Sequence, residues 1–262
     1  MIFFLGLHQP ADARHFRFVC VSINRLWTRR KPFRRKVLAL VDSGAFTVLD
    51  KHGHYPETHS VERYAQHLHR LYTEGVLTIL AAVAQDYMCE ERIRAKTGLS
   101  TLDHQQLTIE RYDALIAELR RLFKGHIPFH VMPVLQGQSE EDYVHHIVMY
   151  GDRLKTGMWV GVGSVCKRQG DPKVVEGILR AIKKVRPDIL LHGFGVKLTA
   201  LRNLAVRMLL ATADSLAWSF GARKRKRAGQ QSRGGNDWRE ALKFRRQVHR
   251  IRDPYELIWD LV

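Results

Sequence analysis

Eight short runs of apolar and β-branched residues constrain the fold of this chain more than any other feature. They lie at residues 2–7, 18–23, 37–41, 78–83, 129–135, 159–165, 189–196 and 213–218. Several are almost continuously apolar, which is typical of parallel strands that are buried on both faces. We therefore expect eight buried, parallel strands.

Amphipathic helical patterns separate the later runs. Ser60 can cap a helix over 61–72, and Ser139 with Asp142 or Asp171 with Pro172 can begin two more. Further apolar stripes lie at 115–123, 198–208 and 238–248. The alternation predicts an α/β fold, a (β/α)8 TIM-type barrel that forms one domain over residues 1–262. The first two strands are joined by about ten residues, too few for a helical crossover, so a doubly wound sheet is the structural alternative.

The charge of the chain favours an anionic partner. Its 262 residues include 43 Lys and Arg against 26 Asp and Glu, a formal net charge of +17. Such an excess attracts polyanions, which favours nucleic-acid contact over a merely basic, soluble surface. The densest positive charge is Arg223, Lys224, Arg225, Lys226 and Arg227, within a glycine-rich and polar stretch at 221–236. We expect a flexible loop there that contacts phosphates; a solvated tail or a localisation signal would have a similar composition.

Neither a metal nor a membrane is expected. The three cysteines lie far apart and form no CxxC pair, which favours a reducing compartment over a thiolate zinc site: Cys20, Cys89 and Cys166. Four histidines near apolar runs lack any familiar ligand spacing: His52, His54, His130 and His192. The apolar start meets His8 too early for a signal peptide, and no run is long enough to cross a bilayer. We expect a cytoplasmic protein without a cofactor.

Polar residues stand where most of the predicted strands end. In a barrel these ends share one face, where barrel enzymes place their chemistry. The residues concerned are His8, Asn24, Asp42, Asp86, Gln136, Gly163, Ser164, Gly195, Lys197 and Asp214. Any one aspartate could simply cap a turn, but three carboxylates on one face predict a ligand site.

Several of these segments, in order along the chain, resemble a known enzyme group. DSGAF (42–46) is similar to the DSGGFQ signature of tRNA-guanine transglycosylases, and VLQGQ (134–138) to their VQGG element. VGVGSV (160–165) stands where they carry a GGL turn, and ADSLAWS (213–219) where they carry the nucleophile. The chain more closely resembles the DpdA family of deazapurine DNA modification proteins, through LGLHQP, VSINRL, AQDYMCE, GVGSVCKR and HGFGVK. The resemblance extends from about residue 3 to residue 222.

This resemblance implies an activity and assigns roles to residues. Guanine in DNA would be replaced by a 7-deazaguanine, such as 7-cyano-7-deazaguanine, through a covalent aspartyl-glycosyl intermediate. Asp214 matches the nucleophile, Asp42 the general acid/base, and Asp86 the carboxylate that reads the purine. The other matched residues are Gln136 and Gly163 for the O6 edge, Ser43 and Ser164 as further base-binding residues, and His8 and Lys197 as additional candidates. The implied partners are DNA and a free 7-deazaguanine base.

Two departures from the tRNA enzymes affect the choice of polymer. Their CxCxxC…H zinc site has no counterpart here, because no cysteine follows Cys166. Trp218-Ser219-Phe220 stands where their Pro-Thr-Arg follows the nucleophile segment. Both favour DNA over tRNA. A tRNA-guanine transglycosylase is the first alternative, and a nucleic-acid-binding barrel without catalysis is the second.

Overall fold

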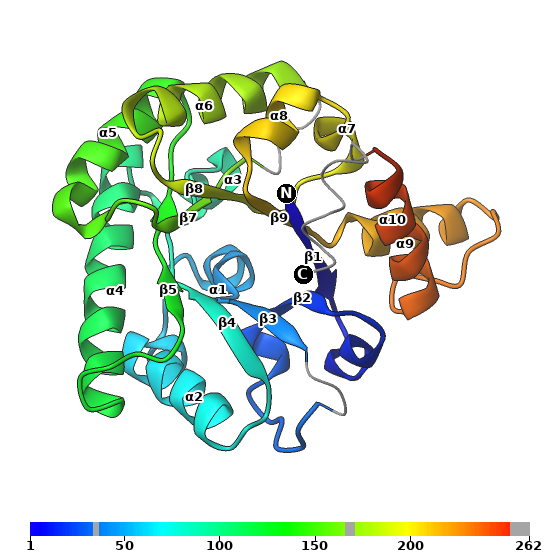
Figure 1. The fold of residues 1–262 in the computed structure, drawn as a ribbon, viewed down its shortest axis with the longest axis horizontal. Coiled ribbons are helices and arrows are strands. Elements are labelled where there is room, and N and C mark those ends of the chain that lie inside the picture. Colours follow the sequence, from blue (N-terminus) through cyan, green and yellow to red (C-terminus); the bar gives the residue numbers. More distant parts are fainter. Residues whose placement is uncertain (34–36, 166–170, 252–262) are drawn as a thin grey trace.

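The computed structural model describes residues 1–33, 37–165 and 171–251. Within them, one parallel sheet curves into a nearly closed barrel of nine strands, with the order β5-β4-β3-β2-β1-β9-β8-β7-β6 (Figure 1). The strands are β1 (Ile2–Leu7), β2 (Phe18–Ser22), β3 (Leu38–Asp42), β4 (Thr78–Val83), β5 (His130–Met132), β6 (Val134–Leu135), β7 (Trp159–Val162), β8 (Leu190–Gly193) and β9 (Thr212–Ser215). β1 pairs with both β2 and β9, which places the first and the last described strands side by side in the middle of the sheet.

The α/β barrel prediction is right in class, but the sheet is not a clean eight-stranded barrel. The apolar run at 129–135 forms two short strands on either side of Pro133. Proline has no N–H to donate to a ladder, so the run cannot pair continuously. Its first part pairs with β4 and its second with β7, so the chain changes partner at the proline. Because β5 and β6 are consecutive parts of one segment, the two edges of the sheet meet at Pro133 and the barrel is nearly closed, unlike the doubly wound alternative.

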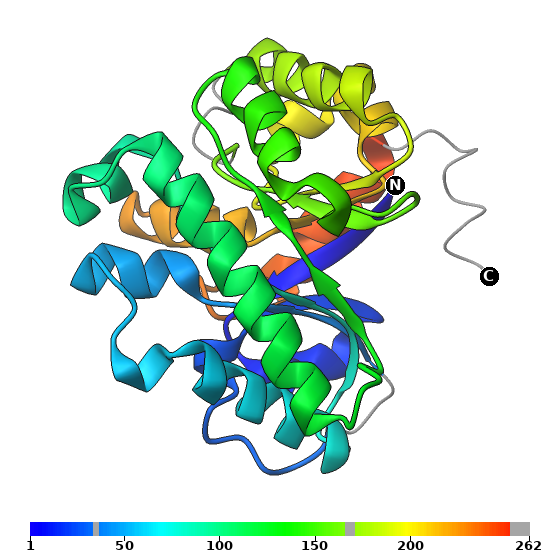
Figure 2. The same cartoon turned by 90° about the vertical axis from the view of Figure 1, so that its left-hand side faces the viewer.

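Most of the helices cover the outside of the barrel, whereas α1 lies at its mouth and projects inside the ring of strands in Figure 1 (Figures 1 and 2). The helices are α1 (Ala45–His52), α2 (Val61–Thr73), α3 (Glu91–Thr97), α4 (Thr101–Leu122), α5 (Glu140–Tyr150), α6 (Pro172–Val185), α7 (Leu198–Leu201), α8 (Leu204–Leu209), α9 (Ala217–Arg227) and α10 (Trp238–Ile251). Short 3-10 helices are η1 (Pro10–His15), η2 (Ile23–Arg25), η3 (Glu57–His59) and η4 (Gly151–Arg153). None of the helices described is long and apolar enough to span a bilayer.

The predicted helix starts at Ser60, Ser139 and Asp171 are confirmed, since each side chain accepts a backbone N–H of the first turn. The stripe at 198–208 is wrong as a single helix. Asn203 interrupts it, because its side chain caps α8 by accepting the N–H groups of Ala205 and Val206. η1 and η2 stand where the short first connections leave no room for a full α-helix.

The expected flexible loop at 221–236 is wrong as far as Arg227, because the basic run lies in α9. α9 packs against α10, and Arg225 forms an ion pair of 2.8 Å with the buried Glu240 of α10. Arg225, one of the five cations of the run, is therefore paired with a carboxylate inside the fold. The remaining basic residues of the run are discussed with the site below.

The alternation of side chains along the strands places the polar residues inside the barrel. Phe4, Leu40 and Val134 belong to an apolar cluster that fills the interior. Burying a side chain of this size contributes about 1.5–3 kcal/mol. Because side chains alternate every second residue along a strand, Asp42 follows Leu40 and Gln136 follows Val134 on the inner face. The apolar floor therefore fixes which polar groups project into the mouth above it.

Candidate active site

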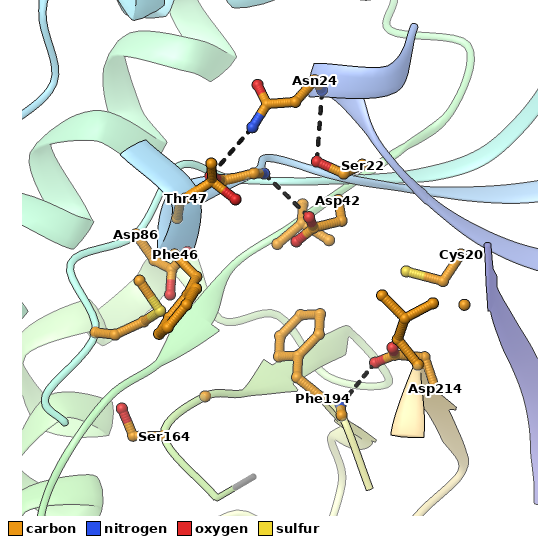
Figure 3. Close-up of a pocket in the computed structure, with 18 of the residues that line it drawn as sticks. Cys20, Ser22, Asn24, Asp42, Phe46, Thr47, Asp86, Ser164, Phe194 and Asp214 are labelled. Carbon is orange, nitrogen blue, oxygen red and sulfur yellow. Dashed lines mark hydrogen bonds between the residues drawn. The ribbon is translucent and has the colours of Figure 1, made fainter. Parts of the chain in front are cut away.

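A pocket of about 630 Å³ opens at the carboxyl-terminal ends of the strands (Figure 3). Four carboxylates line it: the three predicted aspartates, Asp42 at the end of β3, Asp86 just after β4 and Asp214 in β9, and also Glu90, just before α3. The other predicted residues that line it are His8, Asn24, Gln136, Gly163, Ser164 and Gly195. Ser43 and Lys197 are not among the lining residues, and Ser43 is only 1% exposed. The structure thus brings most of the predicted strand-end residues into one cavity.

Asp86 belongs to a buried hydrogen-bond network. Gln136 Nε2 donates to Asp86 Oδ2, and Ser164 Oγ donates to Gln136 Oε1 at 2.7 Å. The backbone N–H of Cys89 donates to Ser164 Oγ at 3.0 Å. Because its oxygen accepts from Ser164, the Gln136 amide turns its NH₂ group toward Asp86 and keeps a second N–H to offer a ligand.

The electrostatics of Asp86 follow from this setting. Burial and then the negative charge of Asp42 raise the pKa of Asp86 to about 7, against the opposing hydrogen bond from Gln136. The loop that carries it is held in place because Tyr55 Oη donates to the Asp86 carbonyl at 2.8 Å. Near neutral pH, Asp86 is therefore poised between its neutral and ionised forms.

The turn at Gly163 and Ser164 shapes the floor beside this network. A Cβ at position 163 would clash with the side-chain amide of Gln136, so only glycine allows the amide to lie there. Ser164 has a left-handed backbone with φ of 55°, which costs a non-glycine residue free energy and is often seen at functional sites. Tyr143 Oη donates to the carbonyl of Gly163 at 2.6 Å and fixes the turn from outside.

Asp42 lies at the turn into α1. The N–H of Gly44 donates to Asp42 Oδ2 at 3.1 Å, and Gly44 has the left-handed φ of 74° that this turn requires. Asn24 Nδ2 donates to the carbonyl of Gly44 at 3.4 Å, which braces the turn from β2's side (Figure 3). Burial and then the charge of Asp214 raise the pKa of Asp42 to about 6. This value suits a group that gives and takes a proton near neutral pH.

Asp214 faces Asp42 and Asp86 from the opposite wall of the pocket and has different hydrogen-bond partners. Its Oδ1 accepts the backbone N–H of Gly195 at 2.9 Å and lies 3.3 Å from His192 Nε2. Burial and the nearby charges of Asp214 and Asp42 raise the pKa of the Cys20 thiol, so this thiol stays protonated and hydrogen-bonds to Asp214. Hydrogen-bond donors therefore lie around the Asp214 carboxylate.

A buried chain of hydrogen bonds sets the proton on His192. Trp159 Nε1, which can only donate, lies 2.7 Å from Thr212 Oγ1. Thr212 Oγ1 lies 2.7 Å from His192 Nδ1, and the hydroxyl proton is free to point at that nitrogen. This arrangement allows His192 to accept at Nδ1 and to donate from Nε2 to Asp214. The sequence offered His192 only as a metal-ligand candidate; its place two residues before Phe194 in an apolar strand was the signal of an inward polar group.

Several pocket residues were not predicted. Phe46 and Phe194 both line the pocket as aromatic walls, and Phe46 is 39% exposed (Figure 3). Cys20 and Ser22 line its inner face from β2, and Arg25 lines its rim. Two-residue alternation from Cys20 to Ser22 could have identified this face of β2. Arg25 lies in the 3-10 helix η2, which no apolar pattern in the sequence predicts.

His8 connects the pocket with α9. Its Nε2 lies 2.8 Å from Ser219 Oγ, and its pKa is lowered by burial and then by the charges of Arg223 and Arg25. Arg223 borders a separate cleft of about 730 Å³, which we call the α9 cleft; it is lined by Arg223, Lys226, Arg227, Arg233, Trp238 and Arg239 among others. The structure thus places three residues of the predicted basic run in a cleft beside the pocket, rather than in the pocket.

The structure also bears on possible metal ligands and on the three cysteines. Among the residues described, no group of three or more His, Cys, Asp and Glu side chains is arranged to hold a metal ion. Cys20 and Cys89 are free and buried, whereas Cys166 lies outside the described residues.

Comparison with known proteins places the pocket in a family. No curated protein matches the chain. A family model described as "DpdA: DeoxyPurine in DNA protein A" matches residues 1–258, which include every residue of the pocket. The match implies a role in the insertion of a deazapurine into DNA. The chain therefore belongs to the DpdA family.

Proposed function

We propose that this protein is a transglycosylase that replaces guanine in DNA with a 7-deazaguanine base. The observation that carries the proposal is the meeting of three carboxylates from β3, β4 and β9 in one pocket of a DpdA-family barrel. Asp214 and Asp42 differ in their surroundings, as expected if one is the nucleophile and the other the general acid/base. Asp214 is surrounded by donors, and Asp42 has a pKa raised to about 6.

In the first half-reaction, Asp214 attacks C1′ of the target deoxyribose through a carboxylate oxygen. The C1′–N9 bond breaks, the bonding electrons leave with guanine, and Asp42 delivers the proton that neutralises the departing base. The strand is then joined to Asp214 by an ester-like glycosyl bond, as in retaining glycosidases.

In the second half-reaction, the ring nitrogen of the incoming 7-deazaguanine attacks C1′. Its proton passes to Asp42, the bond to Asp214 breaks, and the carboxylate is regenerated. Protons balance over the cycle, because Asp42 gives one to guanine and takes one from the new base. A pKa near neutrality is what such a two-way role needs.

Recognition of the base would fall to the other wall of the pocket. Ionised Asp86 accepts the ring N–H and the exocyclic amine of guanine, and the second N–H of Gln136 meets the carbonyl at position 6. Adenine would leave these buried groups unmatched, which disfavours it strongly. The rings of Phe46 and Phe194 offer apolar faces for a flat base.

The rival without catalysis also has an observation in its favour. Asp42 accepts the N–H of Gly44 and so does cap a turn, as a purely structural aspartate would. This rival gives no role to Asp214, whose partners orient a carboxylate in a cavity open to ligands. Covalent capture of the strand distinguishes the two readings.

The test incubates the purified protein with labelled guanine or a 7-deazaguanine, with DNA and tRNA supplied separately. We expect label in DNA. Nucleoside mass spectrometry of DNA and tRNA from expressing cells with a deazapurine supply gives the matching result in cells. Incorporation into tRNA alone would replace the proposal with a tRNA-guanine transglycosylase, and no incorporation into either polymer would favour the binding-only barrel.

A further inference from the structure

A second basic hollow borders the pocket on the side away from α9. This groove, which we call the α2 groove, has a volume of about 770 Å³ and lies between α1, α2 and the segment after β2. Its basic lining is Arg30, Lys51, His52, Arg63, His67 and Arg70. No acidic residue is among its lining residues within the described chain.

The charges of the α2 groove are of two kinds. Arg30 and Arg70 share Glu74, at 3.3 and 2.8 Å, so internal pairs partly offset them. Lys51 and Arg63 are exposed and form no ion pair with any described carboxylate. These two cations are therefore available to an anionic ligand.

The positive charges of the groove act on His59. Its pKa is lowered by burial and then by His52, Lys51 and Arg63, so these charges all face one imidazole. Concentrated like charge is unfavourable in the absence of a ligand. An anion that binds between these groups would relieve the repulsion.

The α2 groove continues directly into the pocket. Asn24 and Thr47 line both hollows, and Asn24 also braces the turn that holds Asp42. Arg111 links residues of the two sites: its Nη2 donates at 3.2 Å to the carbonyl of His59, which lines the groove, and at 2.7 Å to Oε1 of Gln85, the residue before Asp86. A chain that leaves the pocket over Thr47 would enter the groove without crossing a carboxylate surface.

Aromatic side chains lie on the wall of the groove. The ring of Trp27 lies 4.3 Å from that of His67 and 5.9 Å from that of His59, between centroids. Cations that follow a backbone, combined with aromatic rings, are typical of single-strand binding surfaces, where the rings contact bases. An acidic peptide would need the cations but not the continuity with a base-sized pocket.

We propose that the α2 groove binds the sugar–phosphate backbone of the target DNA strand on one side of the exchanged nucleotide, opposite the α9 cleft. The strand then runs from the α9 cleft across the pocket mouth to Lys51 and Arg63. This path rests on the proposed function for the placement of the nucleotide in the pocket. It commits the protein to contact phosphates on both flanks of the target guanine.

The test compares Lys51→Gln/Arg63→Gln with Lys155→Gln/Arg120→Gln. The control pair removes the same charge from exposed residues at the other end of the barrel, where Lys155 borders a separate cleft. Affinity for a labelled single-stranded oligonucleotide with one guanine is measured by anisotropy over a range of salt concentrations. We expect the salt slope of the α2-groove variant to flatten by about 0.7 log unit per lost contact, and that of the control to match the parent. Equal salt slopes in all three proteins would overturn the proposal. That result is also the one expected if the α2 groove binds an acidic protein and not DNA.

Shortened oligonucleotides then test the path. Removing the nucleotides on one side of the guanine should abolish the difference between the parent and the α2-groove variant. Removing the other side should abolish the difference between the parent and Arg223→Gln/Lys226→Gln. If both variants respond to the same truncation, the two hollows do not bind opposite flanks and the path is wrong.

These binding assays test the groove proposal separately from base exchange, which tests the proposed function. If the parent exchanges no base yet the α2-groove variant loses salt dependence, the proposed function fails and the groove remains a DNA site. If the parent exchanges bases and the variant binds like the parent, the groove proposal fails alone.

Discussion

The floor of the pocket and the surface around its mouth carry opposite charges. The pocket presents Asp42, Asp86, Asp214 and Glu90, whereas the two flanking hollows present mainly arginine and lysine, with Asp12 and Asp237 as the acidic residues of the α9 cleft. Despite the net charge of +17, burial raises the pKa values of Asp42 and Asp86 to about 6 and about 7. Burial and the neighbouring carboxylates thus outweigh the more distant positive charge, which solvent screens.

This difference separates two tasks that a DNA-modifying enzyme must perform. Phosphates need exposed cations, whose contribution to binding depends on salt. Bond exchange at C1′ needs carboxylates in a site shielded from solvent, where charge interactions are stronger. Substitutions in the floor should therefore change the chemistry and leave the salt slope of binding intact, and substitutions at the rim should do the reverse.

The largest effect is expected at Asp214. In Asp214→Asn the amide cannot attack C1′, so both base exchange and any denaturant-resistant protein–DNA adduct should disappear. The N–H of Gly195 can still donate to the remaining oxygen, so the fold should persist. Denaturing gels and peptide mapping of the trapped adduct check this. The salt slope of DNA binding serves as the control and should equal that of the parent; an adduct mapped to Asp42 would reverse the assignment of the two aspartates.

Asp42→Asn should slow exchange by roughly 10²–10⁴-fold and still permit DNA binding, since a general acid/base contributes about that much. The pH dependence sharpens the assignment. Because its pKa is raised to about 6, Asp42 is mostly protonated below that pH and loses its proton above it. Because reading of the base also needs Asp86 ionised, with its pKa of about 7, single-turnover release of guanine by the parent should peak between these two values, and the variant should lose the fall at higher pH. A fall that survives in Asp42→Asn would belong to another group.

The barrel class could be predicted because apolar runs report burial directly. The break at Pro133 lies within one such run, and only the competition between β4 and β7 for its backbone decides how it pairs. α9 was missed for a different reason. Its charged sequence has little apolar periodicity, and its contact with α10, including the Arg225–Glu240 pair, supplies what the sequence window lacks.

Within the pocket, the carboxylates could be predicted because each follows a buried strand, and parallel strands end on one face. Their surroundings could not. The contact between Gln136 and Gly163 and the chain from Trp159 to Asp214 join residues far apart in sequence. No local pattern specifies such partners. The resemblance matched Gly163 to the O6 edge of the base, and only the structure shows that the amide of Gln136 occupies the space a Cβ at this position would need.

Asp86→Asn should have an intermediate effect on exchange and a positive effect on stability. Losing charged hydrogen bonds to the base, worth about 1.5–3 kcal/mol, should lower kcat/KM by roughly 10–100-fold. The folded-state pKa of about 7 lies above the ordinary value of 3.8, so the folded protein binds this proton more tightly and its stability falls as pH rises between these values. Removal of the charge should therefore raise the free energy of unfolding above pH 7 by about 1–4 kcal/mol.

Denaturant unfolding at pH 8 and pH 4 measures this gain, which should be much smaller at the lower pH, where Asp86 is protonated in the folded state and about half protonated in the unfolded state. Gln136 can still donate to the oxygen of Asn at position 86, so the network is not the source of the change. A loss of stability at pH 8 would contradict the raised pKa. DNA binding at several salt concentrations should match the parent, as for the other floor variants.

The smallest effect is expected at the rim, and α9 itself contains the control. Arg223, Lys226 and Arg227 line the α9 cleft, whereas Arg225 is paired with Glu240, whose side chain is 2% exposed. Replacing the first three with Gln should flatten the salt slope of DNA binding by about 0.7–0.9 log unit per lost contact. Arg225→Gln should leave the slope unchanged and instead lower the free energy of unfolding by about 1–3 kcal/mol, because Glu240 loses a partner in a buried position. Lys243, 3.5 Å from the same carboxylate, limits that loss. If Arg225→Gln flattened the slope as much as each of the others, the whole run would act as a diffuse positive charge, and the division between a fold contact and a phosphate cleft would be wrong.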